Sequence, residues 1–322
     1  WRSAQDNQQA VQLTYQDGRD LVVQAVANAY LLIIADASRV DSIRAQVKTA
    51  QALYDRAVDR KKAGVSPAID VLRAQVELKQ EQQRLLAQEN QFAKDKLGLG
   101  RVIGLPNGQD FNLAESTPFA PLEKMSPQEA EGIAYKQRPD YQSAQKQVRA
   151  AEESLRGARG EWYPTAGLNA YYGADGTTPT SSHGIFGITG SVNFNIFDGG
   201  RIKADVEQAR ATLKQRKDSL ADLGGQIDYQ VRSALLDIQS AADQVTVAQS
   251  NVALAAQTLE QARDRFSAGV ADTVEVVQAQ ESVASANDNL IAALYAHNSA
   301  KVALARALGT AEQGLDKFLT VK

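Results

Sequence analysis

The chain has 322 residues, no cysteine, two histidines and 6% aromatic residues, and alanine and glutamine are frequent. Its 35 Lys and Arg residues are interleaved with 38 Asp and Glu residues, giving a net charge of −3, so it has no basic surface for nucleic acid. The lack of cysteine excludes a disulfide framework, a thiolate nucleophile and a cysteine-based zinc site, and the composition is typical of long polar helices.

The first part of the chain is expected to form a helical hairpin. A helix ends at the breaker Ala63-Gly64-Val65, after which Ser66 is expected to cap a second helix with Pro67 at its first position. No apolar run approaches 18 residues, the longest lying at 29–35, so we expect no transmembrane helix. The sequence begins at Trp1 without a charged-then-apolar leader, and we expect any export signal to lie outside it.

A connector and two shorter helices follow the first hairpin. Residues 104–108 contain Gly and Pro and are expected to end the helix. Ser126 and Glu129 have the spacing of a capping box, which predicts a short helix to about Gln137. A longer helix is expected to restart at 138–140 and to end near Gly160.

Residues 162–199 are expected to form a β-hairpin of the kind that crosses an outer membrane. Apolar residues alternate with small and polar ones over about 165–173 and again over 186–196, which is the two-residue period of a strand. Strands of this length with one apolar face suit a transmembrane β-barrel. The residues expected to face lipid are Phe186, Ile188, Val192, Phe194 and Ile196. The loop 175–184 would be an exposed turn that includes His183.

A soluble amphipathic hairpin is the alternative interpretation of the same pattern. A single hairpin is only marginally stable in water, however, and no other strand is predicted that would cover its apolar face. Open strand edges are not tolerated in lipid, so further strands would have to complete the sheet.

The last part of the chain predicts a second, longer hairpin. Apolar residues spaced by threes and fours run from Ile227 to Phe266, and many of them are alanine, which permits close approach of a partner helix. The helix is expected to begin soon after Gly200 and to end near Ser267, about 65 residues or roughly 100 Å. Gly224 and Gly225 are expected to interrupt or kink it. After the breaker 268–270, Asp272 or Thr273 is expected to cap a helix to about 308.

The two hairpins are related by an internal repeat. Sliding the chain by 205 residues places 26–104 on 231–309 without a gap, and the tip sequence Ala63-Gly64-Val65 falls on 268–270. This predicts a first repeat at 1–104, a connector at 105–138, a second repeat at 139–309 and a C-terminal tail at 310–322. The first repeat lacks the counterpart of 139–205, so we expect roughly 65 residues or more to precede Trp1 in the full protein.

These features together resemble the TolC-like outer-membrane efflux protein family, with the N-terminal part truncated. The resemblance covers nearly the whole chain and is carried by the repeat and by several motifs. These are Arg138-Pro-Asp before a helix, Trp162-Tyr-Pro-Thr, Phe194-Asn-Ile-Phe-Asp-Gly-Gly-Arg201, and the tip motif that begins at Ala63 and again at Ala268. It implies a mainly α fold of long antiparallel coiled-coil hairpins in two repeats with one transmembrane β-hairpin. It also implies assembly as a homotrimeric channel with a 12-stranded β-barrel and a periplasmic α-barrel of twelve helices.

The resemblance implies an exit duct in the bacterial outer membrane that extends into the periplasm. Such a duct belongs to a tripartite efflux or type I secretion system and conducts substrates passively, while an inner-membrane transporter supplies the energy. The hairpin tips would dock onto a periplasmic adaptor (membrane fusion) protein, and the strands would contact outer-membrane lipid. No cofactor and no metal are implied.

The tip and gate residues carry over from the family position by position. The residues that match the tip motif are Gly64, Val65, Asp70, Gly269, Val270 and Glu275. Family members often place acidic rings at the periplasmic constriction, for which Asp272, Glu275 and Gln278 are the candidates, although Gln278 stands where a second acid can occur. Three copies of such a ring would repel one another, a physical basis for a cation-sensitive gate. Ordinary solvated surface charges are the alternative.

An enzyme finds no support in the sequence. It has no GxSxG, Walker A or HExxH pattern, and Gly184, Gly187 and Gly190 do not form a dinucleotide fingerprint. The alternative function is a structural or adaptor coiled-coil protein of the periplasm that uses the same heptads for partner helices. The strand alternation distinguishes the two, because a coiled-coil scaffold has no use for a lipid-facing hairpin.

Overall fold

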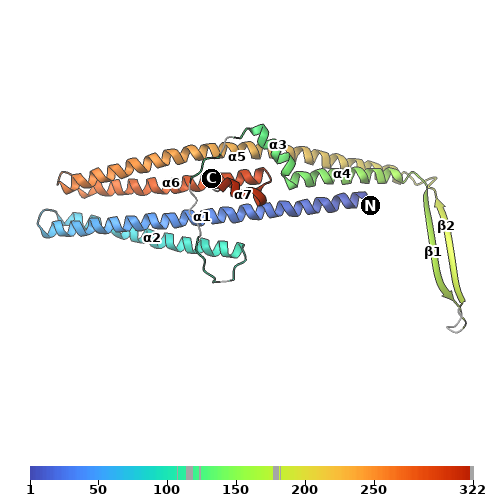
Figure 1. Ribbon diagram of the computed structural model, residues 1–322, viewed down its shortest axis with the longest axis horizontal. Helices are drawn as coiled ribbons and strands as arrows, with labels where there is room; N and C mark the ends of the chain where they lie inside the picture. Colours follow the sequence, from blue (N-terminus) through green and yellow to red (C-terminus); the bar gives the residue numbers. More distant parts are fainter. Residues whose placement is uncertain (107, 114–118, 123–124, 177–180, 182, 320–322) are drawn as a thin grey trace. The chain divides into compact units, whose positions relative to one another are not determined.

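A computed structural model shows a mainly α-helical chain with one β-hairpin, which confirms the predicted fold class (Figure 1). The structure describes residues 1–322 except 107, 114–118, 123–124, 177–180, 182 and 320–322. Backbone contacts divide the chain into two compact units, residues 1–15 with 139–225 and residues 16–138 with 226–322.

Seven helices and two strands make up the described residues. The helices are α1 (Arg2–Lys62), α2 (Ala68–Val102), α3 (Pro127–Gln137), α4 (Pro139–Gly160), α5 (Arg201–Ser267), α6 (Thr273–Ala307) and α7 (Ala311–Leu319). The strands are β1 (Thr165–Asp175) and β2 (His183–Asn193). Helix α7 occupies most of the segment 310–322, for which the sequence predicted a C-terminal tail. Helix α5 continues through Gly224 and Gly225, where the sequence predicted an interruption, because i→i−4 bonding tolerates glycine at a cost of only about 1 kcal/mol each.

The two long hairpins, α1–α2 and α5–α6, repeat each other with the offset seen in the sequence (Figure 1). Helices α2 and α6 both contain 35 residues and begin at 68 and 273, while α1 and α5 end at 62 and 267. Both pairs of positions differ by the same 205 residues. Glycines with positive φ end all four helices, and they obey the offset too: Gly64 and Gly104 match Gly269 and Gly309.

A shared core joins the hairpins near their tips. It contains residues from four helices: Leu53 and Ala57 of α1, Ala74 of α2, Leu259, Ala262 and Phe266 of α5, and Val276 and Ala279 of α6. Four of these eight residues are alanine, whose small side chain lets helix backbones approach closely, as the alanine-rich seam predicted. Further along the bundle, α1 packs on α6 and α7 through Ala27, Leu31 and Val302.

Helix α1 corrects one expectation from the sequence. It contains a window long and apolar enough to cross a membrane by length and composition, so the absence of a continuous apolar run did not exclude such a helix. Single polar residues break the unbroken apolar run, but the mean hydropathy over the whole segment stays high. Leu31, Ile33 and Ala35 of this helix are buried core residues, and 33% of the apolar window is buried within the chain.

The unit formed by residues 1–15 and 139–225 is held by small polar contacts between helices. The Ser143 hydroxyl in α4 donates to the Ala10 carbonyl of α1 at 2.9 Å, and Ser3 bonds Ser154 at 2.9 Å. Lys217 of α5 pairs with Glu152 of α4 at 3.1 Å. The short serine side chains permit the same close helix approach that alanine permits elsewhere.

Three helix N-termini test the capping predictions. Asp272 caps α6 by accepting from the Glu275 N–H at 3.1 Å, and Ser126 caps α3 by accepting from the Glu129 N–H at 3.2 Å, as predicted. Ser66 does not cap α2. Pro67, with φ −70° and ψ 156°, is the N-cap residue instead, and the Ser66 hydroxyl donates to the Asp70 carboxylate at 2.6 Å. The helix begins at Ala68, so Ser66 precedes the N-cap position, and Pro67 has no side-chain oxygen that could cap.

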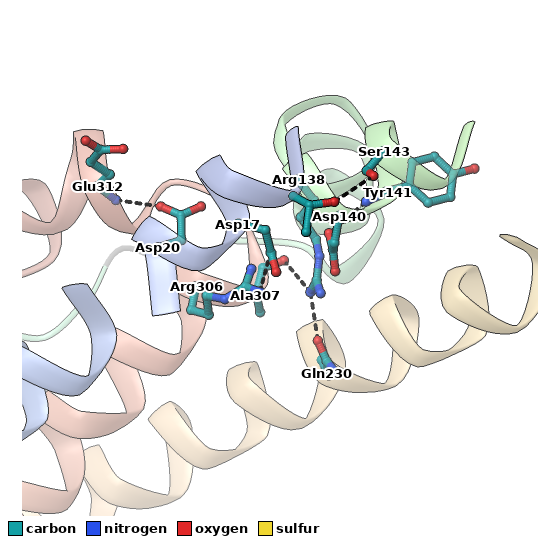
Figure 2. Close-up of polar contacts among 11 residues, drawn as sticks. Asp17, Asp20, Arg138, Asp140, Tyr141, Ser143, Gln230, Arg306, Ala307 and Glu312 are labelled. Carbon is teal, nitrogen blue, oxygen red and sulfur yellow. Dashed lines mark hydrogen bonds and ion pairs between the residues drawn. The ribbon is translucent and has the colours of Figure 1, made fainter. Parts of the chain in front are cut away.

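A buried polar network fixes the end of α6 in the unit of residues 16–138 and 226–322 (Figure 2). Arg306 pairs with Asp17 of α1 at 2.5 Å. The buried Arg138 side chain donates to Gln230 of α5 at 2.7 Å and to the Ala307 carbonyl at 3.3 Å. The network joins α1, α5 and α6 to the residue that ends α3, so it sets the register of these helices.

Helix α7 is attached to α1 by the same region. The Asp20 carboxylate accepts from the Glu312 N–H at 3.0 Å, which caps the first turn of α7 from another helix, and Arg19 pairs with the Glu312 side chain. A carboxylate at a helix N-terminus is favourable because the exposed N–H groups there carry partial positive charge.

Gly309 and Gly269 provide a matched test of packing at this network. Both have positive φ (+73° and +78°), but a Cβ at Gly309 would lie 2.7 Å from the Arg138 backbone, whereas one at Gly269 would meet nothing within 4 Å. We expect Gly269→Ala to cost about 1–2 kcal/mol from the left-handed conformation alone. Gly309→Ala should cost clearly more, because Arg138 has to move. Denaturant unfolding of both variants measures the difference, and equal losses would show that Arg138 accommodates the methyl group.

Candidate functional site

The two hairpin tips have the same backbone structure. At the first tip the Gly64 N–H bonds the Lys61 carbonyl and the Val65 N–H bonds the Arg60 carbonyl, both at 3.0 Å. At the second tip, Gly269 and Val270 make the equivalent bonds to 266 and 265 at 3.1 and 3.0 Å. This is the Schellman arrangement, which needs positive φ at its glycine and so explains why the tip motif contains Gly at both positions.

The tips present an apolar residue and an acid each. Val65 and Val270 are 65% and 69% exposed, so both side chains point into solvent. Asp70 and Glu275 occupy repeat-related positions in the first turns of α2 and α6. Their surroundings differ, because Asp70 accepts from Ser66 while Glu275 pairs with Arg265 at 3.1 Å. The predicted tip residues therefore lie at the two tips, but the repeat is not symmetric in its side-chain contacts.

An arginine that the sequence did not single out links one tip to the other. The Arg60 guanidinium lies 4.7 Å from the centre of the Phe266 ring and donates to the Phe266 carbonyl at 2.9 Å. It thus stacks on the ring and adds a second donor to a carbonyl at the end of α5 that already accepts from the Gly269 N–H. Its repeat counterpart Arg265 faces Glu275 instead. The Asp-Arg pair shared by both tips was visible in the sequence, but its different roles were not.

A groove lies behind the tips between α2 and α6. Its volume is about 510 Å³, and its apolar walls are Ile69, Leu72 and Val76 of α2 with Val274 and Val277 of α6. Arg73, Gln80, Gln278 and Glu281 line its polar part. Several of these apolar side chains are about half exposed, so the groove is an uncovered surface of this chain.

The candidate gate residues lie at the start of α6. Asp272, Glu275 and Gln278 are spaced by three, which places them on successive turns of one side of the helix. Asp272 and Gln278 are exposed. The Asp272 carboxylate caps α6 and the Glu275 carboxylate pairs with Arg265, so both acids already have partners within the chain.

The β-hairpin has one apolar face and one polar face. The register pairs Leu168 with Gly190, Ala170 with Ile188 and Tyr172 with Phe186, so the apolar residues of both strands lie on the same side. On the opposite side, Gly167 pairs with Ser191 and Asn169 with Thr189. The five large residues of the apolar face are 60–84% exposed; they are Leu168, Tyr172, Phe186, Ile188 and Val192. The predicted alternation thus becomes a continuous apolar surface that nothing in the described chain covers.

Two of the predicted lipid-facing residues lie outside the strand. Strand β2 ends at Asn193, so Phe194 and Ile196 follow it as exposed irregular residues. The partner strand begins at Thr165, opposite Asn193, and is preceded by Pro164, which has no N–H to extend the ladder. His183 begins β2 instead of lying in the loop. Residues 177–180 and 182 of the predicted loop lie outside the described residues.

A tyrosine fills the polar face of the hairpin where the sequence has glycine. A Cβ added at Gly187 would lie 2.5 Å from the Tyr171 ring, with which this residue is paired across the strands. The ring therefore lies directly over the glycine, as aromatic residues do when they cover a backbone that lacks a side chain.

The described residues do not suggest metal or cofactor chemistry. No group of three or more His, Cys, Asp or Glu among them is arranged to hold a metal ion. His297 of α6 is buried with its ring 4.9 Å from that of Phe119, and burial lowers its pKa to about 4. The imidazole is therefore neutral at neutral pH and acts as a packing group, while the nearby Lys301 donates to the Ala120 carbonyl at 2.5 Å.

A family model described as outer membrane efflux protein matches residues 1–105 and 132–310. Among curated proteins, the pyoverdine export outer membrane protein OpmQ of Pseudomonas aeruginosa is 24% identical over 300 residues, covering 89% of this chain and 61% of OpmQ. The toluene efflux pump outer membrane protein TtgC of Pseudomonas putida is 26% identical over 303 residues, covering 89% of this chain and 60% of TtgC. The chain spans about three fifths of the length of these relatives.

Solved structures share the fold. The outer membrane protein VceC from Vibrio cholerae superposes with a TM-score of 0.80 at 19% identity, covering 96% of this chain and 74% of VceC. The MtrE outer membrane channel of Neisseria gonorrhoeae gives a TM-score of 0.83 at 16% identity, covering 96% of this chain and 70% of MtrE.

Asp272 variants separate helix capping from charge at the second tip. We expect Asp272→Ala to remove the cap of α6 and cost about 1 kcal/mol, because the Glu275 N–H loses its acceptor. Asp272→Asn retains an acceptor oxygen and should cost little. Hydrogen–deuterium exchange of the first turn of α6 should therefore accelerate several-fold in the alanine variant only. Equal acceleration in both variants would mean that the charge, and not the cap, stabilises this turn.

Proposed function

Since this chain belongs to the outer membrane efflux protein family, we propose that the protein is a passive exit duct of the bacterial outer membrane that extends into the periplasm. It is not an enzyme, and transport through it is driven elsewhere. The single observation that carries the proposal is the apolar face of the β-hairpin, which is exposed along its whole length in the isolated chain. Lipid is the environment in which such a face is stable.

The dimensions of the hairpin support a membrane crossing. Each strand has 11 residues, and tilted strands of about 9–11 residues cross the hydrocarbon layer. The polar face would line the water-filled interior, where Asn169, Thr189 and Ser191 are suitable residues. Unpaired strand edges are unstable in lipid, so the two free edges require neighbouring strands. We propose that they come from the rest of the complete protein and from further subunits, in a 12-stranded barrel.

A homotrimer would supply those neighbours. Proteins of this family form trimeric channels within tripartite pumps. In this chain Leu236, Val247 and Leu254 of α5 are 60–71% exposed and are spaced by 11 and 7 residues, which places them on one face of the helix. Leu86 and Leu97 of α2 form a similar uncovered face with a spacing of 11. We propose that neighbouring protomers cover these faces in a periplasmic α-barrel.

The tips would bind a periplasmic adaptor protein, which connects the duct to an inner-membrane transporter. Exposed Val65 and Val270, the glycine turns and the partly exposed Glu275 supply an apolar and charged docking surface, while the Asp70 side chain, 15% exposed, supports the first tip from behind through Ser66. The names of the relatives indicate different cargo, including pyoverdine and toluene, so the proposal assigns no substrate to this chain.

A gate is proposed at the start of α6. In a trimer, three copies of Asp272 and Glu275 would form acidic rings, with Gln278 one turn further along. Cations would screen the repulsion between the copies, because like charges held together at low dielectric repel strongly. The ion pair between Arg265 and Glu275 would weaken the repulsion between the copies of Glu275. Opening of the gate would therefore depend on the ion pair and on the repulsion.

Arginine substitutions on the two faces of β2 test the duct. We expect Ile188→Arg to cost about 2–4 kcal/mol, because this side chain would face hydrocarbon near the midplane, and to reduce the yield of trimer in membranes. Thr189→Arg, one residue along on the polar face, should leave the trimer intact and shift its conductance in planar bilayers toward anions. Membrane fractionation and single-channel recording give the result. Equal trimer yields would contradict the assignment of the faces.

Aspartate substitutions at the tips test the adaptor surface. Val65→Asp and Val270→Asp should weaken binding to the cognate adaptor at least about tenfold, because each places a charge in an apolar contact. Val102→Asp, also on an exposed valine but at the other end of α2, is the control. Trimer formation should be unchanged in all three. The docking role would be wrong if the tip variants bound the adaptor as the control does.

A further inference from the structure

A cavity lies among four helices, next to the groove behind the tips, with which it shares Glu77. Its volume is about 400 Å³, and residues from α1, α2, α5 and α6 line it. Leu259, Val283 and Ile291 are apolar residues of the lining. The lining also contains two carboxylates, Glu77 and Glu81, which are one turn apart on α2. All of these residues belong to the unit of residues 16–138 and 226–322.

The two carboxylates are largely buried, and one of their oxygens has no hydrogen-bond donor among the described residues. Glu77 is 6% exposed, and it lines both this cavity and the groove behind the tips. Glu81 is 5% exposed, and its Oε1 accepts from Arg84 at 2.9 Å, but its Oε2 has no partner among them. An ionised carboxylate can only accept hydrogen bonds, so the Glu81 Oε2 requires a donor that the described part of the chain does not supply.

Two side-chain amide oxygens at the cavity also lack a hydrogen-bond donor. The side-chain oxygens of Gln46 in α1 and Gln280 in α6 are buried and without a partner in the described chain. Buried acceptors without donors are costly and are rare in folded proteins. Three helices thus each bring one unpartnered oxygen to this cavity, from Gln46 of α1, Glu81 of α2 and Gln280 of α6, which suits a ligand that donates hydrogen bonds.

The charges around the cavity favour a cation. Burial raises the pKa of both Glu77 and Glu81, and the carboxylates of Glu281 and Asp288 on α6 add to this effect. Arg84 is the one cation acting on the two residues in the opposite direction. A bound cation would offset this accumulation of negative charge and keep the carboxylates ionised.

We infer that this cavity binds a primary alkylammonium ion. An ammonium group has three N–H donors, which suit the oxygens of Glu77, Glu81 and the two glutamines, and an alkyl chain suits the apolar side at Leu259 and Val283. A metal ion fits less well, because no three acidic or histidine side chains in the described residues converge on a site. The cavity is also within the size range of sites for small organic ligands.

Occupancy would connect the two hairpins. Glu77 and Glu81 belong to α2 of the first hairpin, whereas Gln280, Val283 and Leu259 belong to the second. A cation between them replaces repulsion among carboxylates of α2 and α6 with shared attraction. The cavity lies among the hairpin helices themselves, and the inference rests on its lining residues and not on the proposed transport function.

Binding of n-butylammonium chloride to the protein purified in detergent tests the inference. We expect saturable binding by calorimetry and saturation-transfer NMR, weakened at least about tenfold by Glu77→Gln, because a charge-assisted hydrogen bond is lost. Glu89→Gln, an exposed glutamate on the same helix, should leave binding unchanged. Butan-1-ol, which has the same chain without the charge, should bind at least tenfold more weakly. Binding should also weaken as pH falls, because protonation of the raised-pKa carboxyls competes with the cation.

A second variant keeps the test independent of folding at Glu77. Thr49→Met, on α1 at the cavity wall, fills space while retaining both carboxylates and should weaken binding to a similar degree. Circular dichroism and trimer yield show that each variant is folded. The inference is overturned if butylammonium binds the wild type and Glu77→Gln equally. It is also overturned if MgCl2, and not butylammonium, gives the binding that depends on Glu77.

Discussion

Uncovered apolar surface is the constraint on which the rest of this structure depends. The five large residues on one face of the β-hairpin are exposed, and in water a two-stranded sheet with such a face is barely stable. The same is true of the exposed leucines along α2 and α5. A chain built in this way needs lipid against its strands and other helices against its hairpins. The membrane location and the assembly in the proposed function both follow from that need.

The repeat supplies a common backbone, and side chains then give each half a different role. The glycine turns at Gly64 and Gly269 are alike because only a left-handed residue can end a helix in this way. Arg60 and Arg265 are equivalent in sequence, yet one reaches Phe266 in the other hairpin and the other pairs with Glu275. Such differences let the first tip contact the second hairpin through Arg60, while the equivalent arginine of the second tip makes an ion pair within its own hairpin.

Buried polar groups divide into two kinds in this chain. Around Arg138 and Arg306, donors and acceptors from several helices meet at 2.5–3.3 Å and fix helix register (Figure 2). Around the cavity at Glu81, Gln46 and Gln280, acceptors meet without donors among the described residues. The first arrangement is a structural joint, because its bonds are made within the chain. The second is incomplete by itself, which is the physical reason to assign it a ligand.

Local features of the chain were enough to predict most helix ends, the strand alternation and the repeat, because each depends on glycine at a positive φ, on a capping side chain such as Asp272, or on a period of two residues. The predicted start of α2 was early, because Pro67 is the N-cap residue, and the predicted end of β2 was late, because the position of the partner strand sets it. The packing of the helices was needed to show that Arg60 contacts Phe266, that Arg138 packs against Gly309 and that the Glu81 Oε2 is buried without a donor. Contacts between residues far apart in the chain depend on how helices pack, and no local pattern encodes that packing.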